Sequence, residues 1–477
     1  MISIVIKKEI LENLLTLRFA VLTLFCVILI PLSFYFNYKS YQTHLNDYRE
    51  TVRLHQEKLN TVYARNYTEK MKGFRAPSPL MVFARGLEDI LPRWVTATKS
   101  GPEFGKATSS QEAIQTFVEN VDFHFIIKFI FSLVALLFSF NLICGEKEKG
   151  TIRQTLANSI PRHQLLLGKI IGSYSVLIIP FLFSFVIGLL LLSFLAPELL
   201  SGENLLRIFS IMVTSLLYVS VFFTLGLLIS TETKNTITAL VILLFLWILI
   251  VFVIPGVSNI LAKIVYPVKT EQVLNLEKDL IQKQINKEKA EALKDILLRF
   301  QEGGGMGGWT EEGRKRFEQY QKARKPIAKK FEEREQKELA KLDREYWQDK
   351  QHQEKLTVLF SRLSPAPAFS YAITNFTNTG LACKHDFNSA AINFNMAMND
   401  EVYSKIWRDE FMFGETSRIS QGGFYESPPK EVNNFSFEGH NFSESLSHSW
   451  VDILLLVIYN ILFFIGSYVA FLRYDVR

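Results

Sequence analysis

Six long apolar runs constrain this chain more than any other feature of its sequence. They extend over Phe19–Phe36, Phe123–Cys144, Ile170–Ala196, Ile208–Ile229, Ile237–Val257 and Val451–Leu472. An α-helix needs about 20 apolar residues to cross the hydrocarbon core of a bilayer, so each run is long enough for one span. Lys128 lies near the start of the second run, where a long side chain reaches the membrane interface. The sequence therefore predicts an all-α polytopic membrane protein with six transmembrane helices.

The composition agrees with this class and excludes several others. Hydrophobic residues make up 48% of the 477 residues and charged residues only 21%, which is too apolar for a soluble chain of this length. The net charge of +6 is modest and is not arranged as a nucleic-acid-binding surface, so we expect no nucleic-acid partner. Two of the three cysteines, Cys26 and Cys144, lie in apolar runs, so no disulfide framework is expected.

Lys and Arg residues in the short connections predict the orientation. They are frequent in the leader and in the loop after the second run, whereas the loop 197–206 contains none. Because cytoplasmic loops carry an excess of Lys and Arg, we expect the leader and the loop after the second run to face the cytoplasm. An even number of spans then places both termini on the cytoplasmic side. The first run lacks a small-residue cleavage site, so it is expected to remain as an anchor.

These features divide the chain into five parts. They are 1–36 with the leader and first span, the first outer insertion 37–122, the second to fifth spans in 123–257, the second outer insertion 258–449, and 450–477 with the last span and a cytoplasmic tail. The two insertions are expected to form a largely helical extracytoplasmic domain.

The charged part of the second insertion predicts a helical hairpin over 268–350. Charges of both signs alternate there, and apolar residues recur at spacings of three and four. A glycine-rich turn, Gly303–Gly308, separates the two arms, and Pro326 is expected to kink the second. In the first insertion, 41–72 has the same character, so we expect it to extend the first span outward and to pack beside the hairpin. Such charge is more often a solvated helix face than a ligand site.

Two short apolar segments follow Ser-Pro sequences in the insertions. Ser78 and Ser364 each precede a proline, which is typical of a helix N-cap and first turn, so we expect helices over 80–91 and 368–376. These helices lie either near the outer membrane surface or inside the outer domain. The remainder, 378–449, is rich in Asn, Ser, Gly and Phe and predicts mixed loop with short elements.

Motifs that would make this chain an enzyme are missing. The glycine run matches G-x-G-x-x-G but follows a charged helix instead of a strand. Thr151 stands where a phosphate-binding loop requires Lys, and Cys383 with His385 makes only two ligands of a metal site. The central parts of the spans carry no Asp or Glu, which disfavours proton coupling. We therefore expect no catalytic residue, cofactor or metal in this chain, and an energy source in a partner.

The loop after the second run is the most informative stretch. It contains Glu146, Lys147 and Glu148, followed by Lys149, Gly150 and Thr151, and later Ser159-Ile-Pro-Arg162 and Leu167-Gly168-Lys169. This order resembles the permease subunits of ABC-2 type ATP-binding cassette transporters, whose loop carries E-K-E-x-G-T, then a small residue and Pro with Arg nearby, then L-G-K at the third span. The resemblance covers 1–36, 123–257 and 450–477 and leaves both insertions unmatched.

The resemblance implies an architecture and a set of partners. It implies that the leader, with Ile6, Ile10 and Leu14 at helical spacing, is an amphipathic elbow helix. It also implies that the loop 145–169 forms a short coupling helix that docks on a cassette ATPase. That contact would be made by Glu146, Lys147, Glu148, Gly150 and Thr151. The ATPase subunits would bind ATP and Mg, and a second copy of this chain or a related permease would complete the transporter in a bacterial inner membrane.

Three functions remain open at this point. The first is the permease subunit of an ATP-driven exporter. The second is an ATPase-coupled mechanotransmitter whose outer domain acts on an envelope partner without moving a solute. The third is a membrane scaffold without an ATPase.

Overall fold

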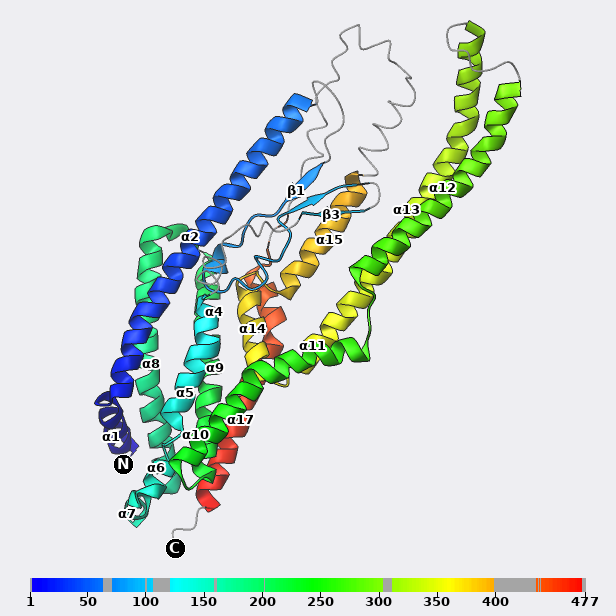
Figure 1. Ribbon diagram of the computed structural model, residues 1–477. Helices are drawn as coiled ribbons and strands as arrows, with labels where there is room; N and C mark the ends of the chain where they lie inside the picture. Colours follow the sequence, from blue (N-terminus) through cyan, green and yellow to red (C-terminus); the bar gives the residue numbers. More distant parts are fainter. Residues whose placement is uncertain are drawn as a thin grey trace.

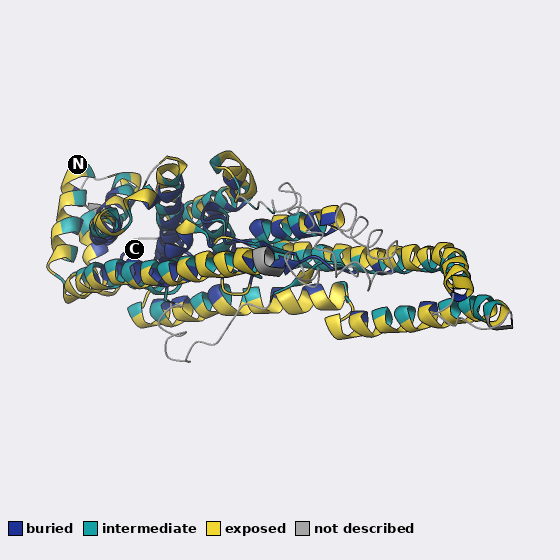
Figure 2. Ribbon diagram, turned by 90° about the horizontal axis from the view of Figure 1, so that it is seen from above, coloured by how far each residue is buried: buried dark blue, intermediate teal, exposed yellow. Residues whose placement is uncertain are grey.

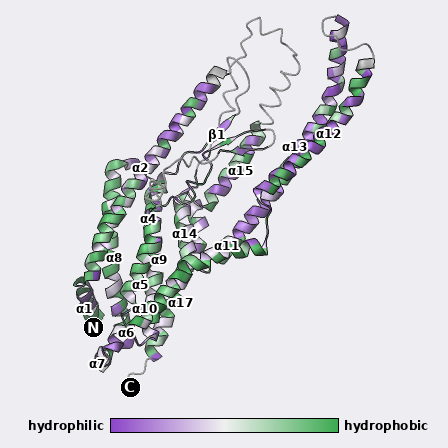
Figure 3. Cartoon of the chain, in the orientation of Figure 1, coloured by the Kyte–Doolittle hydropathy of each residue, from purple (hydrophilic) through white to green (hydrophobic). Residues whose placement is uncertain are grey.

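Six helices that are long and apolar enough to cross a membrane dominate the computed structural model, which describes residues 2–62, 71–98, 101–105, 121–157, 161–200, 202–302, 311–398, 435, 437 and 439–473. These helices extend over Leu17–Lys58, Phe123–Glu148, Arg162–Leu195, Glu203–Glu232, Thr236–Val265 and Phe442–Arg473. Each coincides with one of the six predicted runs, the third of which ends one residue after its helix, so the all-α polytopic fold class is confirmed. Figure 3 shows apolar residues concentrated along these helices and polar residues along the outer part of the molecule.

The leader folds as a helix that packs on the third span. It forms α1 (Ile2–Leu14), which a short break separates from α2 (Leu17–Val62), the helix that contains the first span. Two glycines of α8 (Arg162–Leu195) face α1, and a Cβ on Gly168 or Gly172 would lie within 3 Å of Val5 or Glu9. The absence of a side chain at these positions therefore lets the two helices approach closely.

The central helix of the bundle is α9 (Glu203–Glu232), which packs against α5 (Ser132–Ser139) and α17 (Phe442–Arg473). The second span is composed of α4 (Phe123–Phe125), a π-helical segment η2 (Ile126–Phe131) and α5. The fifth span likewise joins α10 (Thr236–Ile248) through a π-helical segment η4 (Leu249–Val253) to α11 (Ile254–Val265). Figure 2 shows the buried residues gathered inside the bundle, away from the outer helices.

The predicted hairpin is present as α12 (Glu271–Glu302) and α13 (Glu311–Ser361), about 48 and 76 Å long at 1.5 Å per residue. The two arms pack against each other, and Leu274 and Ile285 of α12 and Leu339 of α13 are buried. Lys289 and Arg334 form ion pairs across the hairpin, with Glu332 at 3.1 Å and Glu288 at 2.6 Å. Helix α13 continues through Pro326, and the glycine turn lies outside the described residues. Figure 1 shows the hairpin projecting far from the bundle.

The first insertion contains a small sheet that the sequence did not predict. Strands β1 (Lys72–Phe74), β2 (Trp94–Thr96) and β3 (Glu103–Phe104) pair antiparallel in that order. Phe74 of β1 lies against His55 of α2, with ring centroids 5.3 Å apart, whereas Phe104 of β3 lies against Trp347 of α13. The expectation that the outward extension of the first span packs directly beside the hairpin is therefore wrong, because the sheet occupies the space between them (Figure 1).

Other local expectations for the insertions also need correction. The segment 80–91 forms one 3-10 turn, η1 (Pro79–Val82), followed by turns, because its apolar residues Leu80–Ala84 are buried from every side. The second short helix is present as α14 (Pro365–Phe376), capped by Ser364, and it is buried against α9 and α17. Within the region expected to be mixed loop, Leu381–Met398 forms the regular helix α15. The segment 399–434 lies outside the described residues.

Candidate functional site

The loop that follows the second span is called the inner loop here and is described over residues 144–157. It folds as two short helices joined by a glycine turn. They are α6 (Cys144–Glu148) and α7 (Thr151–Ala157), where a single short helix was expected. Gly150 separates them with a φ of +75°, a left-handed conformation that glycine adopts without steric cost. Its N–H donates to the carbonyl of Lys147 at 3.2 Å, so the turn is also held by a backbone hydrogen bond. Residues 158–160 lie outside the described part, and α8 begins at Arg162.

Two neighbouring charges of α6 bind the ends of the fourth and fifth spans. Lys147 Nζ donates to the carbonyls of Thr231 and Thr233, at the C-terminus of α9. Glu148 Oε2 accepts hydrogen bonds from the N–H and the hydroxyl of Thr236, at the N-terminus of α10. Each charge has the sign that its helix end favours, because a helix carries partial positive charge at its N-terminus and partial negative charge at its C-terminus. The loop therefore joins both spans through their unsatisfied backbone groups.

A buried ion triad connects the loop to the leader and the third span. Lys169 of α8 lies 2.6 Å from Glu9 of α1 and 2.7 Å from Glu146 of α6. The side chains of Lys169 and Glu9 are 3% and 8% exposed, and that of Glu146 is 20% exposed. Two carboxylates around one ammonium compensate its desolvation, whereas loss of either partner would leave a buried charge uncompensated. The triad therefore fixes the three elements in one arrangement.

Further polar contacts bring the remaining inner helix ends to the same place. Ser230 Oγ accepts from the N–H groups of Ile143 and Cys144, at 3.0 and 3.1 Å, which attaches the start of α6 to α9. Arg162 donates to the carbonyl of Leu472 at 2.7 Å, near the C-terminus of α17. The loop is thus bonded directly to α8, α9 and α10, and α8 is in turn bonded to α1 through Lys169 and to α17 through Arg162. The inner ends of these helices meet beside α6 and α7 in Figure 1.

The outward surface of the loop is basic and polar. Lys149, Thr151, Arg153 and Gln154 are exposed, whereas Ile152 between them is completely buried. The buried Ile152 anchors α7 to the bundle, so the exposed side chains occupy fixed positions on a rigid surface. The loop can therefore receive a partner on this face and pass its displacement to the spans.

The predicted site residues divide into two groups. Glu146, Lys147 and Glu148 connect the loop to other helices, Glu148 through a contact at the exposed surface, whereas Gly150 and Thr151 are exposed. Sequence reasoning missed Glu9 and Thr236, which lie far from the loop in the chain. Lys169 was noted only as part of the L-G-K sequence, and nothing in that sequence indicates its two partners.

The described residues hold no group of three or more His, Cys, Asp or Glu side chains that would form a metal site. Cys383 and His385 both lie on α15. Burial raises the pKa of the Cys383 thiol to about 12, which keeps it protonated, and burial lowers the pKa of His385. His385 lies 3.4 Å from Glu354 of α13, so its surroundings are those of a contact between two helices.

The chain is similar to known transporter proteins. The family described as "ABC-2 family transporter protein" matches residues 3–476, which includes both outer insertions. Among curated proteins, the "Probable ABC transporter permease protein NosY" of Pseudomonas aeruginosa is 34% identical over 119 residues. The aligned stretch covers 25% of this chain and 43% of that protein, so the similarity spans less than half of the relative's length.

Proposed function

The chain belongs to the ABC-2 family of transporter proteins, and from this premise we propose that it is the transmembrane permease subunit of an ATP-driven transporter. Separate cassette ATPase subunits bind ATP and Mg and dock on the inner loop, and a second copy of this chain or a related permease completes the assembly. The complex lies in a bacterial inner membrane with both termini in the cytoplasm. Transport is directed outward, as an exporter.

The observation that carries this proposal is the direct bonding of the inner loop to α8, α9 and α10. A docking surface transmits the movement of a bound partner only if it is firmly attached to the spans. The buried Lys169 triad and the two helix-end contacts of Lys147 and Glu148 supply that attachment. A movement of a bound ATPase would therefore displace α8, α9 and α10 together as rigid helices.

The outer domain favours a second candidate, an ATPase-coupled mechanotransmitter. Arg362, which directly follows α13, forms a bidentate ion pair with Asp452 of α17, at 2.7 and 2.9 Å, and Asp452 is completely buried. Tyr266, which follows α11, donates to Asp349 of α13 at 2.6 Å. The hairpin is thus attached to the fifth and sixth spans, so a tilt of either span would swing an arm about 76 Å long. Such an arm suits mechanical action on an envelope protein.

Affinity purification of the tagged chain from its native host tests the assignment. We expect a cassette ATPase to copurify, and its ATP hydrolysis to depend on the permease. Absence of any ATPase would favour the scaffold. Movement of labelled lipid or solute by the reconstituted complex in vesicles would support the exporter, whereas an active ATPase that moves neither would favour the mechanotransmitter.

A further inference from the structure

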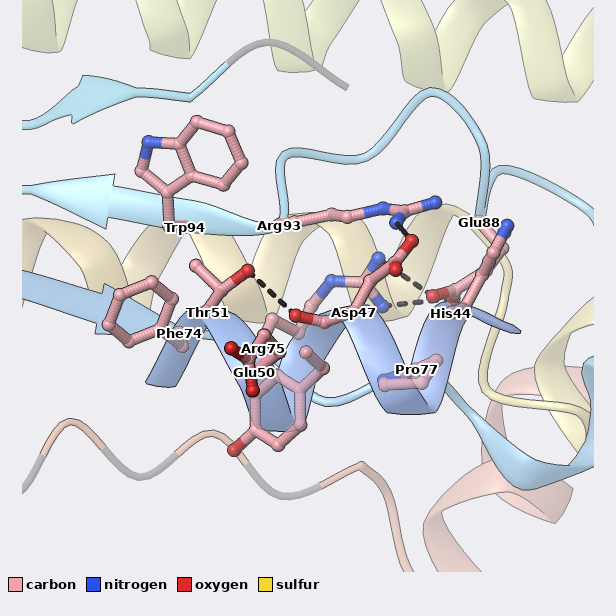
Figure 4. A pocket seen from close by; sticks show the side chains of 11 residues that line it. His44, Asp47, Glu50, Thr51, Phe74, Arg75, Pro77, Glu88, Arg93 and Trp94 are labelled. Carbon is pink, nitrogen blue, oxygen red and sulfur yellow. Dashed lines mark hydrogen bonds and ion pairs between the residues drawn. The ribbon is translucent and has the colours of Figure 1, made fainter. Parts of the chain in front are cut away.

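A pocket lies in the outer domain, between α2 and the three-stranded sheet, far from the inner loop. Its volume is about 230 Å³, which suits a small molecule or one amino-acid residue instead of a large ligand. Figure 4 shows Trp94 and Phe74 at one end of the pocket, His44 at the other, and Arg93 extended along its upper side. None of these residues takes part in the contacts of the inner loop.

The aromatic end of the pocket follows from the register of the sheet. Phe74 and Trp94 are direct partners in the antiparallel pairing of β1 and β2, so their side chains emerge on the same face, toward α2. Behind Trp94 lies Gly105, where a Cβ would come within 2.0 Å of the indole ring. The glycine lets the ring lie flat against the backbone. The two rings therefore form a fixed apolar surface that a planar or branched group can pack against.

At the other end, some of the lining side chains already form ion pairs or hydrogen bonds within the protein and others do not. Arg75 and Glu88 form a buried bidentate pair at 2.9 and 3.0 Å, so both are occupied. His44 is only 5% exposed, and its imidazole has no hydrogen-bond partner among the described residues. Because His44 lines the pocket, its imidazole can donate a hydrogen bond to a ligand atom or accept one from it.

Arg93 is the second lining residue whose hydrogen-bond donors can reach a ligand. Its side chain is 25% exposed, and within the described parts of the chain its guanidinium has one ion-pair contact, to Asp47 at 3.9 Å. That distance is too long for a hydrogen bond, so the donors of Arg93 remain available. The lining carboxylates that are not buried, Asp47 and Glu50, lie at the exposed rim, and Glu50 is already held by Arg53 at 2.6 Å.

Away from this rim, Arg93 and His44 therefore supply hydrogen-bond donors next to an aromatic wall. We propose that this pocket binds a small carboxylate, which Arg93 and His44 hold while its aromatic or branched apolar body packs on Trp94 and Phe74. A guanidinium matches a carboxylate with two parallel hydrogen bonds, which no neutral acceptor of this size reproduces. The ligand is either a free small molecule or the C-terminal residue of a peptide, since both present the same group. This inference does not depend on the coupling of the inner loop to an ATPase.

The test uses the full chain in lipid nanodiscs and isothermal titration calorimetry. N-acetyl-L-phenylalanine is the probe, and its C-terminal amide, which differs only in lacking the carboxylate, is the matched control ligand. We expect the amide to bind at least about 10-fold more weakly, as loss of a charge-assisted pair costs about 1.5 kcal/mol or more. A tripeptide that ends in phenylalanine distinguishes the two sources: binding comparable to the probe indicates a peptide terminus, and binding of the probe alone indicates a free molecule.

Variants locate the site on the protein. Arg93→Gln should weaken binding of the probe at least about 10-fold, and Arg93→Lys should weaken it less because the charge is kept. Arg49→Gln is the matched control. Arg49 lies on α2, which forms one wall of the pocket, but its side chain is exposed and does not line the pocket. Equal affinity for acid and amide, an unchanged affinity of Arg93→Gln, or no binding heat up to about 10 mM probe would each overturn the proposal. The comparison of acid with amide on the unaltered chain does not depend on how any variant folds.

Discussion

Lys169 lies in contact with two carboxylates, Glu9 of α1 and Glu146 of α6. Because Glu146 is one of them, its charge serves the internal packing of the protein, not the exposed docking face. Replacing Glu146 by Lys would therefore place a second cation beside Lys169 and disturb the fold. Variants intended to probe docking must instead lie at the exposed residues Lys149 and Arg153.

Removal of the triad's cation should destabilise the protein strongly. Lys169→Met leaves Glu9 and Glu146 buried without their shared partner, which typically costs about 3–5 kcal/mol. We expect a clearly lower Tm and lower abundance in the membrane. Lys7→Met, at an exposed position of α1, is the matched control and should change the Tm little. An unchanged Tm for Lys169→Met would contradict the triad.

Asp122, which caps the outer end of the second span, predicts a pH dependence of stability. Burial raises its pKa to about 6, above the ordinary value of 3.8, although the N–H groups of Arg85 and Phe125 favour its ionised form. The folded chain keeps this proton up to about pH 6, whereas the unfolded chain releases it near pH 4. The contribution of Asp122 to stability is therefore greatest below pH 4 and is lost as the pH rises to about 6.

The check compares the Tm of the wild type and of Asp122→Asn at about pH 4.5 and about pH 7, which lie on either side of the folded-state pKa of about 6. The variant stays neutral throughout, so its Tm should fall less than that of the wild type over this interval. The same fall in both proteins would show that Asp122 does not titrate in the folded state as described.

At the scale of elements, the sequence predicts those helices whose apolar pattern is long and periodic. The six spans and the hairpin arms each repeat their apolar pattern over many turns, so local sequence alone indicates them. The strands of the sheet are two or three residues long, too short for an alternating pattern to show. Helix α14 carried the right start signal at Ser364, but its burial between α9 and α17 depends on residues distant in the chain.

The hairpin gives an element-scale prediction. Leu339 of α13 is 2% exposed, whereas Leu280 of α12 is 64% exposed. In a peptide covering Val268–Lys350, Leu339→Ala should lower the thermal midpoint of the helical circular dichroism signal, with a cost of about 2 kcal/mol. Leu280→Ala, the same chemical change at an exposed site, should have almost no effect. A larger effect at Leu280 would mean that the arms pack through another face.

At the scale of the whole molecule, the candidate site was only partly predictable. The loop residues Glu146 to Thr151 stand out in sequence because they form an ordered string with a family resemblance. Thr236, the partner of Glu148, lies 88 residues away in the chain, and Glu9, which shares Lys169 with Glu146, lies 160 residues from that lysine. No local pattern reports such contacts. The same holds for the Arg362–Asp452 pair that joins the hairpin to the last span. Only folding brings these groups together.

Orientation is a prediction about the whole chain. The three native cysteines are buried, so an introduced cysteine should dominate labelling by an impermeant thiol reagent. We expect Gln284→Cys, exposed on the hairpin, to react in spheroplasts and Gln154→Cys, exposed on α7, to react only after lysis. The reverse pattern would invert the topology and remove the inner loop from the cytoplasm.

The central claim is that an ATPase docks on the exposed face of the inner loop. Lys149→Glu combined with Arg153→Glu reverses two exposed charges on that face, and neither residue belongs to the Lys169 triad or to the helix-end contacts of Lys147 and Glu148. Lys234→Glu is the matched control, because Lys234 is exposed in the short connection between α9 and α10 and its charge is reversed in the same way.

The most direct measurement is the affinity of the purified ATPase for each variant, determined in nanodiscs by titration. Charge reversal at a partly desolvated contact costs about 2–5 kcal/mol, so the double variant should bind about 30-fold more weakly or worse, with an unchanged Tm. The control should remain close to wild type. Wild-type affinity and wild-type ATPase stimulation in the double variant would contradict the account.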